Sequence, residues 1–287
     1  MKISPPEMCR HHCPPHAKDP IQAAHLRALE DEEIGVRHRI FQFYLPLFLD
    51  FCARRGKTPA EVRVLDCGCG NGASVQYLAS AGFQSFGIDI APMRFDQWSE
   101  RVRLAHVALI RGDATALPFA DAVFDIAFSS GMLEHIGVAE ECAPEYRVTP
   151  LPEQRQLRKR FLAECLRVVR PEGIVYIDHP NGAFPIDFWH NDYRSRPRLH
   201  SPFQKFLPTF GEVTELCKLI SAEYSVEAIS PAGRFTFRRS ERQWYGKLFS
   251  GAMRRYLRLL QHEPLRRLAS SPLNPYLVIR IERRPLA

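Results

Sequence analysis

Hydrophobic and polar positions follow two different rhythms along the chain, and the change between them falls near Val62. Before it, apolar residues recur at spacings of three and four, which predicts an amphipathic helix from about Ile21 to Arg55 with Gly56 as its cap. Those apolar positions are Ile40, Tyr44, Leu47, Phe48 and Phe51. Pro46 lies within the pattern and has no amide hydrogen to donate, so we expect it to kink the helix or divide it in two.

After Val62, short runs rich in β-branched and aromatic residues alternate with helical stretches. The predicted buried strands are residues 62–66, 85–90, 106–113, 124–130, 174–178 and 276–282. The clearest helix between them is Glu153 to Val169, which carries an apolar stripe at helical spacing. Alternation of strands and helices predicts an α/β fold with a doubly wound, mainly parallel sheet and helices on both faces.

The most informative segment is VLDCGCGNGASVQYL, in which a strand ends at Asp66 and a helix follows three closely spaced glycines. Glycines at Gly68, Gly70 and Gly72 let a ligand approach the backbone and permit positive φ. The loop alone leaves alternatives open. It also satisfies the G-x-G-x-x-G/A dinucleotide pattern, with Ala73 as the last member, or it is a tight turn without a ligand.

Acidic residues stand at the ends of the next two predicted strands. Asp89 follows Gly72 by seventeen residues, at a distance that suits a carboxylate on a ribose, and Asp113 ends the third strand. The fourth strand ends at Ser129 and Ser130. Because the carboxyl ends of parallel strands meet at the point where the strand order reverses, we expect these residues to share one ligand site.

Taken together, four motifs in register resemble the class I S-adenosylmethionine (SAM)-dependent methyltransferases, particularly the broad bacterial group that methylates small molecules. The motifs, from about Glu61 to Asn181, are LDCGCGNG, GIDI, GDATALPFADAVFDIAFSSGMLEHI and FLAECLRVVRPEGIVYI. The resemblance implies a Rossmann-like sheet of seven strands, with SAM as the cofactor. It is joined here to an N-terminal helical extension and a helical insertion before the last strand.

The resemblance also implies which residues bind SAM. Asp66, Gly68, Gly70 and Gly72 would surround the methionyl part, Asp89 and the adjacent Ile90 the ribose, and Asp113 and Ala114 the adenine. Ser129 and Ser130 would lie near the methyl group that is transferred. A loop with acids beside it and no lysine suits a sulfonium better than a pyrophosphate.

Candidate groups for the methyl acceptor follow the fourth and fifth strands. His135 is the candidate catalytic base because the pKa of histidine lies near neutrality, with packing beside the cofactor as the alternative. Residues 181–208 are too long and irregular for a simple connection, and we expect them to form a substrate lid. The candidate substrate-binding residues there are Phe184, Trp189, His190, Tyr193 and His200. A structural cap over the sheet edge is the alternative.

Charge singles out one further segment. The net charge is +7, yet residues 234–267 hold ten basic and two acidic residues, a local balance of +8, so the remainder sums to −1. A helical apolar stripe runs through this insertion, residues 234–268, with arginines on its other faces. It predicts either a solvated structural helix or one that rests on an anionic membrane surface.

The domain organisation follows from these patterns. Residues 1–20, with five prolines, are expected to be a flexible arm, residues 21–60 a helical cap, and residues 61–287 the methyltransferase domain. The arm's cysteines and histidines fit no common zinc framework, and no metal site is predicted anywhere. Without a recognisable signal peptide or membrane span, the eight cysteines are expected to be reduced in a cytoplasmic protein with at most peripheral membrane contact.

The sequence therefore predicts a SAM-dependent methyltransferase that acts on a small or lipid-linked acceptor, with oxygen as the favoured acceptor atom. Two other classes stay open. One is an NAD(P)-dependent oxidoreductase, although the chain has no Tyr-x-x-x-Lys pair. The other is a non-catalytic SAM-binding protein that uses its basic helix as an interaction surface. No specific nucleic-acid partner is expected, because no added RNA-binding module is evident.

Overall fold

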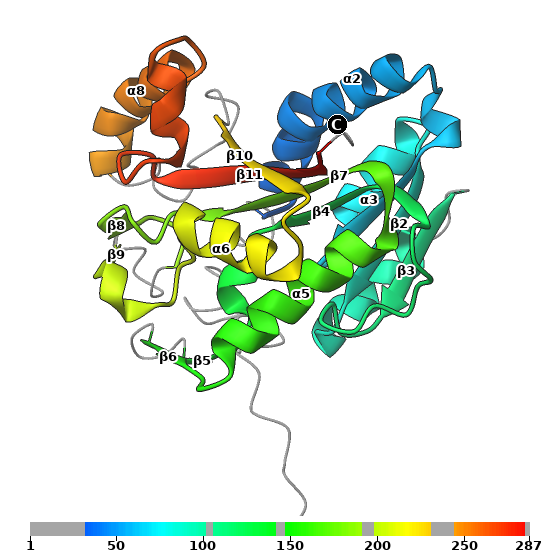
Figure 1. Ribbon diagram of the computed structural model, residues 1–287, viewed down its shortest axis with the longest axis horizontal. Helices are drawn as coiled ribbons and strands as arrows, with labels where there is room; N and C mark the ends of the chain where they lie inside the picture. The colour runs from blue at the N-terminus through cyan, green and yellow to red at the C-terminus, as the bar shows by residue number, and fades with distance from the viewer. Residues whose placement is uncertain (1–31, 102–105, 142–146, 191–197, 231–243, 285–287) are drawn as a thin grey trace, which may run out of the picture.

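The computed structural model describes residues 32–101, 106–141, 147–190, 198–230 and 244–284, and a seven-stranded sheet forms its centre (Figure 1). The strands are β1 (Arg63–Cys67), β2 (Gln84–Asp89), β3 (Val107–Arg111), β4 (Phe124–Ser130), β7 (Val169–Pro180), β10 (Tyr224–Ile229) and β11 (Tyr276–Arg283). Their order is β10-β11-β7-β4-β1-β2-β3. Five strands are parallel, and β11 pairs antiparallel with both β7 and β10. The predicted doubly wound sheet is confirmed.

Helices cover both faces of this sheet (Figure 1). On one face α5 (Gln154–Val168) and α6 (Phe210–Ile220) pack on residues such as Leu65 and Ala127. On the other, α2 (Leu45–Arg55) and α3 (Ala73–Ser80) pack on Val64 and Phe128. Adjacent residues of one strand thus enter different cores, as the period of two in a β-strand requires.

The N-terminal helix adapts to Pro46 without a break. Residues 32–39 are helical, a π-helical turn, η1 (Ile40–Tyr44), follows, and α2 continues from Leu45. The amide of Leu45 donates to the carbonyl of Ile40, so the wider turn lies immediately before the proline that cannot donate. Gly56 closes the helix at φ 61°, as predicted from the sequence.

Short elements connect the main ones. They are η2 (Pro59–Glu61), η3 (Pro92–Gln97), α4 (Trp98–Arg101), η4 (Leu133–His135), β5 (Val138–Glu141), β6 (Arg147–Pro150), β8 (Ile186–Asp187), β9 (Arg198–Leu199) and η5 (Pro202–Gln204). Strands β5 and β6 form one two-stranded sheet, and β8 and β9 form another within the predicted lid.

The predicted insertion lies between the antiparallel strands β10 and β11. It contains α8 (Trp244–Leu259) and η6 (Leu265–Ser270). Leu257 and Leu260 are buried against Trp189 and Leu268, whereas Leu248 and Phe249 are 67% and 59% exposed. The helix therefore packs on the domain through only part of its apolar stripe.

Among the described helices, none combines the length and the apolar character needed to cross a bilayer. The five cysteines within the described ranges are all free thiols. The predicted arm, residues 1–20, and the start of the helical cap lie outside the described residues.

Candidate active site

The three glycines form a tight turn between β1 and α3, and each has a positive φ. The amides of Gly68 and Cys69 both donate to the carbonyl of Ile88, at 2.8 and 3.1 Å, which holds the loop against the end of β2. A Cβ at Gly68 would lie 2.4 Å from Sδ of Met132. A side chain at position 68 is therefore excluded by the positive φ and by Met132, which follows β4.

Asp89 lies where β2 ends and is held by two backbone amides. Its Oδ2 accepts from the Gly70 amide at 2.8 Å and its Oδ1 accepts from the Ala91 amide at 2.8 Å. These bonds orient the carboxylate beside the glycine loop while each oxygen keeps a further lone pair. The side chain of Ile90, next in sequence, is 50% exposed and gives this end of β2 an apolar surface.

The third strand contributes Asp113 and Ala114 to the same edge of the sheet. Asp113 is exposed, and its Oδ1 accepts from the amide of Thr115 at 2.8 Å, while Ala114 is buried. Because β3 lies beside β2 in parallel register, Asp113, two residues after the end of β3, lies at the same edge of the sheet as Asp89. Sequence reasoning placed both residues at this edge, and the fold does so too.

Asp66 is a buried acid at the end of β1, with only 4% of its surface exposed. Burial raises its pKa to about 7, against the opposing hydrogen bond from Ser74. Its Oδ1 has no hydrogen-bond partner among the described residues. An unsatisfied buried carboxylate oxygen beside a glycine loop is the kind of acceptor that a ligand's ammonium group satisfies.

An arginine that the sequence patterns did not single out lies beside these acids. Arg39, in the N-terminal helix, donates to Oγ of Ser130 at the end of β4. Ser130 in turn donates to Oδ1 of Asp178 at 2.9 Å, and the Asp178 carboxylate also accepts from the hydroxyls of Tyr44 and Tyr276. The helical cap therefore supplies a cation to the edge where the strands end.

These residues fit SAM. Arg39 offers a cation for the methionyl carboxylate, Asp66 an unsatisfied oxygen for its ammonium, and Asp89 acceptors for the ribose hydroxyls. Ser129, fully buried beside Ser130, has a hydroxyl without a partner in the described part of the chain. The positive φ values of the glycine loop leave its backbone open to close approach.

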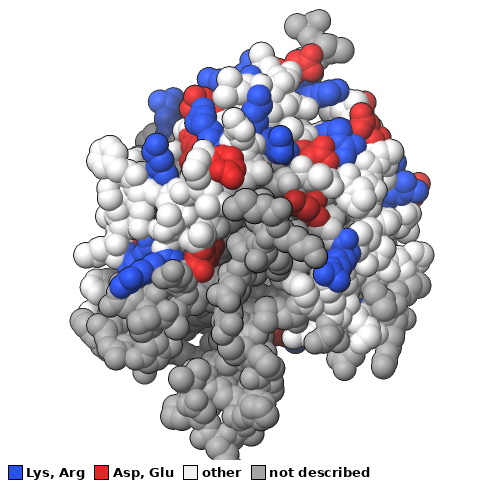
Figure 2. Space-filling model, turned by 90° about the horizontal axis from the view of Figure 1, so that it is seen from below, with Lys and Arg blue, Asp and Glu red and all other residues white. Residues whose placement is uncertain are grey.

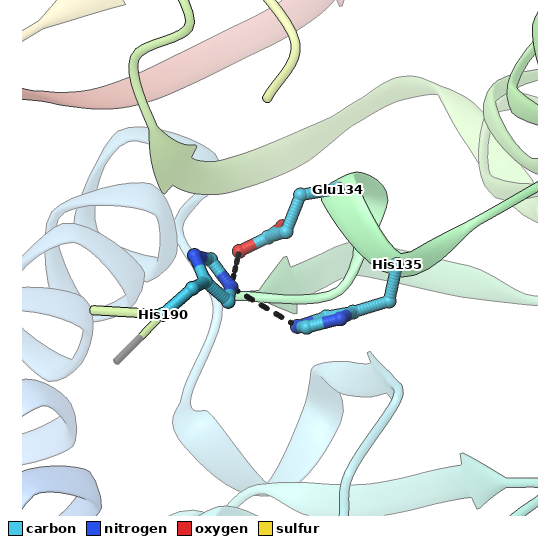
Figure 3. A group of neighbouring side chains, drawn as sticks. All are labelled: Glu134, His135 and His190. Carbon is cyan, nitrogen blue, oxygen red and sulfur yellow. Dashed lines mark hydrogen bonds and ion pairs between the residues drawn. The ribbon is translucent and has the colours of Figure 1, made fainter. Parts of the chain in front are cut away.

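Two histidines and a glutamate form a cluster that includes residues shortly after Met132, the neighbour of Gly68 (Figure 3). Glu134 and His135 come from η4, and His190 comes from the segment after β8. The Nε2 atoms of the two histidines lie 3.4 Å apart, and Nε2 of His190 lies 3.8 Å from Oε1 of Glu134. From the sequence, His135 was a candidate base and His190 a candidate substrate-binding residue. The fold brings the two side chains together.

The Nδ1 atom of each histidine in the cluster contacts a carboxylate. Nδ1 of His190 lies 3.0 Å from Oδ2 of Asp187, and Nδ1 of His135 contacts Oε1 of Glu140. Asp187 is fully buried, and its other oxygen accepts from the amides of Trp189 and His190. Both rings are thereby oriented with Nε2 toward the shared space.

Burial and neighbouring charges shift the pKa values of these groups in opposite directions. Burial alone would lower the pKa of His135, but the bond from Glu140 and the negative charges around it raise the pKa overall. Burial raises the pKa of Glu134. Burial also acts to raise the pKa of Asp187, yet the charge and hydrogen bonds of His190 hold it below its usual value.

Arg158, on α5, fixes the backbone around the cluster from inside the core. It is fully buried and pairs with Glu212 at 2.9 Å. It also donates to the carbonyls of Glu134, at 3.3 Å, and Phe206. The Phe206 ring lies 4.8 Å from the ring of His190, so one arginine ties together both sides of the histidine pair.

The remaining predicted substrate residues divide into three groups. Trp189 packs on Tyr276, at 4.8 Å between ring centroids, and on α8, which makes it a link between the lid segment and the insertion. Phe184 and His200 are half-buried near the ends of β8 and β9, and the Phe184 ring packs on Phe188. Tyr193 lies outside the described residues.

A third histidine, His179, has a different environment. It is fully buried in β7, and burial lowers its pKa to about 4. Its Nδ1 faces the carbonyl of Pro180 at 2.8 Å. A neutral histidine enclosed in the sheet is a poor candidate for receiving a proton from an acceptor.

On the face seen in Figure 2, basic and acidic side chains of the described residues are interspersed, and neither sign of charge predominates. The mixture agrees with a local, rather than global, basic character in the sequence.

Comparison with known proteins agrees with this geometry. Residues 65–177 match the family model described as a methyltransferase domain. The chain is 32% identical over 133 residues to the phthiotriol/phenolphthiotriol dimycocerosates methyltransferase of Mycobacterium leprae, an alignment covering 44% of this chain and 42% of that protein. The corresponding Mycobacterium tuberculosis protein is 32% identical over 139 residues, covering 47% and 44%. The chain thus spans less than half the length of these relatives in alignment.

Among solved structures, the plantazolicin methyltransferase BpumL in complex with SAH matches with a TM-score of 0.55 and 13% identity, covering 93% of this chain and 92% of that one. This likeness concerns the fold. Together with the family match, it shows that residues 65–177 form a methyltransferase domain within a fold shared with a SAM-dependent methyltransferase. The family match favours the methyltransferase interpretation of the glycine loop over the dinucleotide-binding interpretation.

Proposed function

We propose that this protein transfers a methyl group from SAM to a hydroxyl of a lipid-linked or similarly apolar small molecule. The observation that carries the proposal is the juxtaposition of two sites. The donor residues include Gly68, and Met132, which lies against Gly68, precedes Glu134 by two residues and His135 by three.

The donor side uses groups whose charges match those of SAM. Asp89 accepts the ribose hydroxyls, Asp113 and Ala114 flank the adenine, and Asp66 and the glycine loop receive the methionyl end. Arg39 neutralises the methionyl carboxylate. When bound, SAM supplies a methyl group on a sulfonium, so its transfer forms a C–O bond, breaks the C–S bond with the electron pair left on sulfur, and releases the hydroxyl proton.

The acceptor side must hold the hydroxyl and remove its proton. His135 is the candidate base, since its Nε2 faces the shared space while Glu140 holds Nδ1. His190, held by Asp187, lies opposite and positions the acceptor oxygen through its own Nε2. Phe184, Trp189 and His200 would contact the remainder of the acceptor.

A lipid-linked acceptor is supported by the relatives and by the surface of α8. The names of the mycobacterial relatives specify dimycocerosates as the molecules that those proteins methylate. In this chain, Leu248 and Phe249 expose large apolar side chains on a helix that also carries Arg254, Arg255 and Arg258. Exposed apolar residues beside basic ones suit reversible contact with an anionic membrane, where each basic residue contributes about 1 kcal/mol.

The experiment that tests the function uses SAM labelled in its methyl group. Purified protein is incubated with a lipid extract and with a water-soluble fraction of the same cells, and label is followed into each. The proposal expects label in a lipid, as a methyl ether. Label in neither fraction would contradict the catalytic proposal, and label only in the soluble fraction would contradict the lipid-linked acceptor.

A further inference from the structure

We propose that Glu134, His135 and His190 form a binding site for a divalent transition-metal cation, with zinc as the best match. The three side chains offer two imidazole nitrogens and one carboxylate oxygen, all within 4.8 Å of one another. Two histidines and a carboxylate are the ligand set of many three-ligand zinc centres that leave a fourth position open. The sequence predicted no metal site, because His190 follows His135 by 55 residues and no local spacing joins them.

When both rings are neutral, their orientation favours a cation between them. Nδ1 of each histidine faces a carboxylate, Glu140 for His135 and Asp187 for His190, so each neutral ring carries its proton on Nδ1. The two Nε2 atoms then both present lone pairs, at a separation of 3.4 Å. Two lone pairs cannot bond to each other, whereas a cation placed between them receives both.

The separation of the nitrogens also favours one coordination geometry. Zn–N bonds of about 2.0–2.1 Å at a tetrahedral angle place two ligand nitrogens about 3.3–3.4 Å apart. Adjacent octahedral positions with bonds of the same length would place them closer, at about 2.9–3.0 Å. The observed 3.4 Å therefore matches the tetrahedral arrangement. Glu134, whose Oε1 lies 3.8 Å from Nε2 of His190, must move closer to complete the set.

Burial supplies a second, independent observation. The Glu134 side chain is 1% exposed, and its Oε2 has no hydrogen-bond partner within the described part of the chain. A buried carboxylate with an unsatisfied oxygen is costly unless a cation or donor meets it. The carboxylates behind the histidines match the outer shell that metal-binding histidines ordinarily have.

Such a cation would deepen the proposed function, on which this part of the inference rests. An acceptor hydroxyl at the open fourth position would lose its proton to water more readily, because a bound cation stabilises the oxygen anion. His135 would then act as a ligand, and the cation would take over the task assigned to it as a base.

Metal binding can be tested without SAM or acceptor. Metal-free full-length protein is titrated with Zn²⁺ alone by calorimetry, and with Co²⁺ while its visible absorption is recorded. We expect a site that gives the strong absorption of tetrahedral Co²⁺ and that is lost in both Glu134→Gln and His190→Ala. Asp187→Asn should weaken Zn²⁺ binding about 10- to 100-fold. His262→Ala, at an exposed histidine, is the matched control and should bind as the unaltered protein does.

Glu134→Gln retains the shape of the side chain, and SAM binding by each variant reports whether it is folded. Equal Zn²⁺ affinity and equal Co²⁺ absorption in the unaltered protein, Glu134→Gln and His190→Ala would overturn the inference. So would the absence of any tetrahedral Co²⁺ signal in the unaltered protein. Because these titrations involve no methyl transfer, their failure is distinct from failure of the labelled-SAM assay.

Discussion

Arg158 donates to the main-chain carbonyl of Glu134 at 3.3 Å from a fully buried position on α5. The two residues are 24 positions apart in the chain, and the same guanidinium reaches Glu212 and the carbonyl of Phe206. The backbone on both sides of the histidine pair is therefore held by one cation inside the core. The proposed acceptor side of the site depends on this contact, although Arg158 is itself fully buried.

Replacing Arg158 should destabilise the protein strongly. Arg158→Met leaves the carbonyls and the Glu212 carboxylate without their donor, which costs about 3–5 kcal/mol. Arg155→Met on the same helix is the control, because Arg155 pairs with Glu215 at the surface, where such a pair contributes below about 1 kcal/mol. Urea unfolding of both variants measures the difference, and equal losses would contradict the role given to Arg158.

The buried acid Asp66 should make the SAM-free protein less stable as the pH rises. Its pKa of about 7 in the folded state exceeds the ordinary value of 3.8, so between these values the folded protein holds a proton that the unfolded chain has released. The free energy of unfolding should therefore fall from pH 4 to pH 7, by up to about 4 kcal/mol from this group.

Asp66→Asn removes this titration while nearly preserving the shape of the side chain. The difference in unfolding free energy between Asp66→Asn and the unaltered protein should grow with pH over that interval and level off above pH 7. Urea unfolding at several pH values gives the two curves. Parallel curves would show that Asp66 titrates normally.

The acceptor residues should affect turnover and leave donor binding intact. His135→Ala should lower the rate of methyl transfer by about 10²- to 10⁴-fold, and His190→Asn and Trp189→Phe should lower it as well. SAM affinity, measured by calorimetry on the same preparations, should stay near that of the unaltered protein. A His135 variant that loses SAM affinity would move this residue to the donor site, and one with full activity would leave it a packing role.

The basic face of α8 should mediate salt-sensitive binding to anionic vesicles. Co-sedimentation at low salt should be strong, should weaken at high salt, and should be lost when Arg254, Arg255 and Arg258 become glutamine. A triple glutamine variant at Arg155, Lys159 and Arg160 on α5 removes the same charge elsewhere and should still bind. If the unaltered protein fails to sediment with vesicles at low salt, α8 is a structural insertion only.

Much of the donor site could be predicted because its residues are joined by local sequence rules. The glycine loop, Asp89 and Asp113 each stand at a strand end that hydrophobic patterning locates, and the sheet topology brings those ends together. The contact of Arg39 with Ser130 could not be predicted, because it depends on how the N-terminal helix packs on the sheet. A lone arginine on an amphipathic helix gives no sign of such a contact.

The acceptor side was harder to predict for a related reason. His135 and His190 were recognised separately, but their pairing depends on where an irregular segment folds back, which no periodicity encodes. Strand β10 was not identified from its sequence because it lies at the sheet edge, where Ser225 and Glu227 interrupt the apolar pattern. The stripe on α8 was predicted to run through the helix, yet among its described side chains Leu257 and Leu260 are buried whereas Leu248 and Phe249 are exposed.

Calorimetric titration with SAM tests the central claim most directly. The unaltered protein should bind SAM, and Asp89→Ala should bind it about ten- to hundredfold more weakly, since two ribose hydroxyls lose a carboxylate acceptor worth about 1.5–3 kcal/mol. Asp121→Ala, at an exposed acid that pairs with Arg167, should bind like the unaltered protein. No SAM binding by the unaltered protein, or equal affinity in Asp89→Ala, would contradict the account.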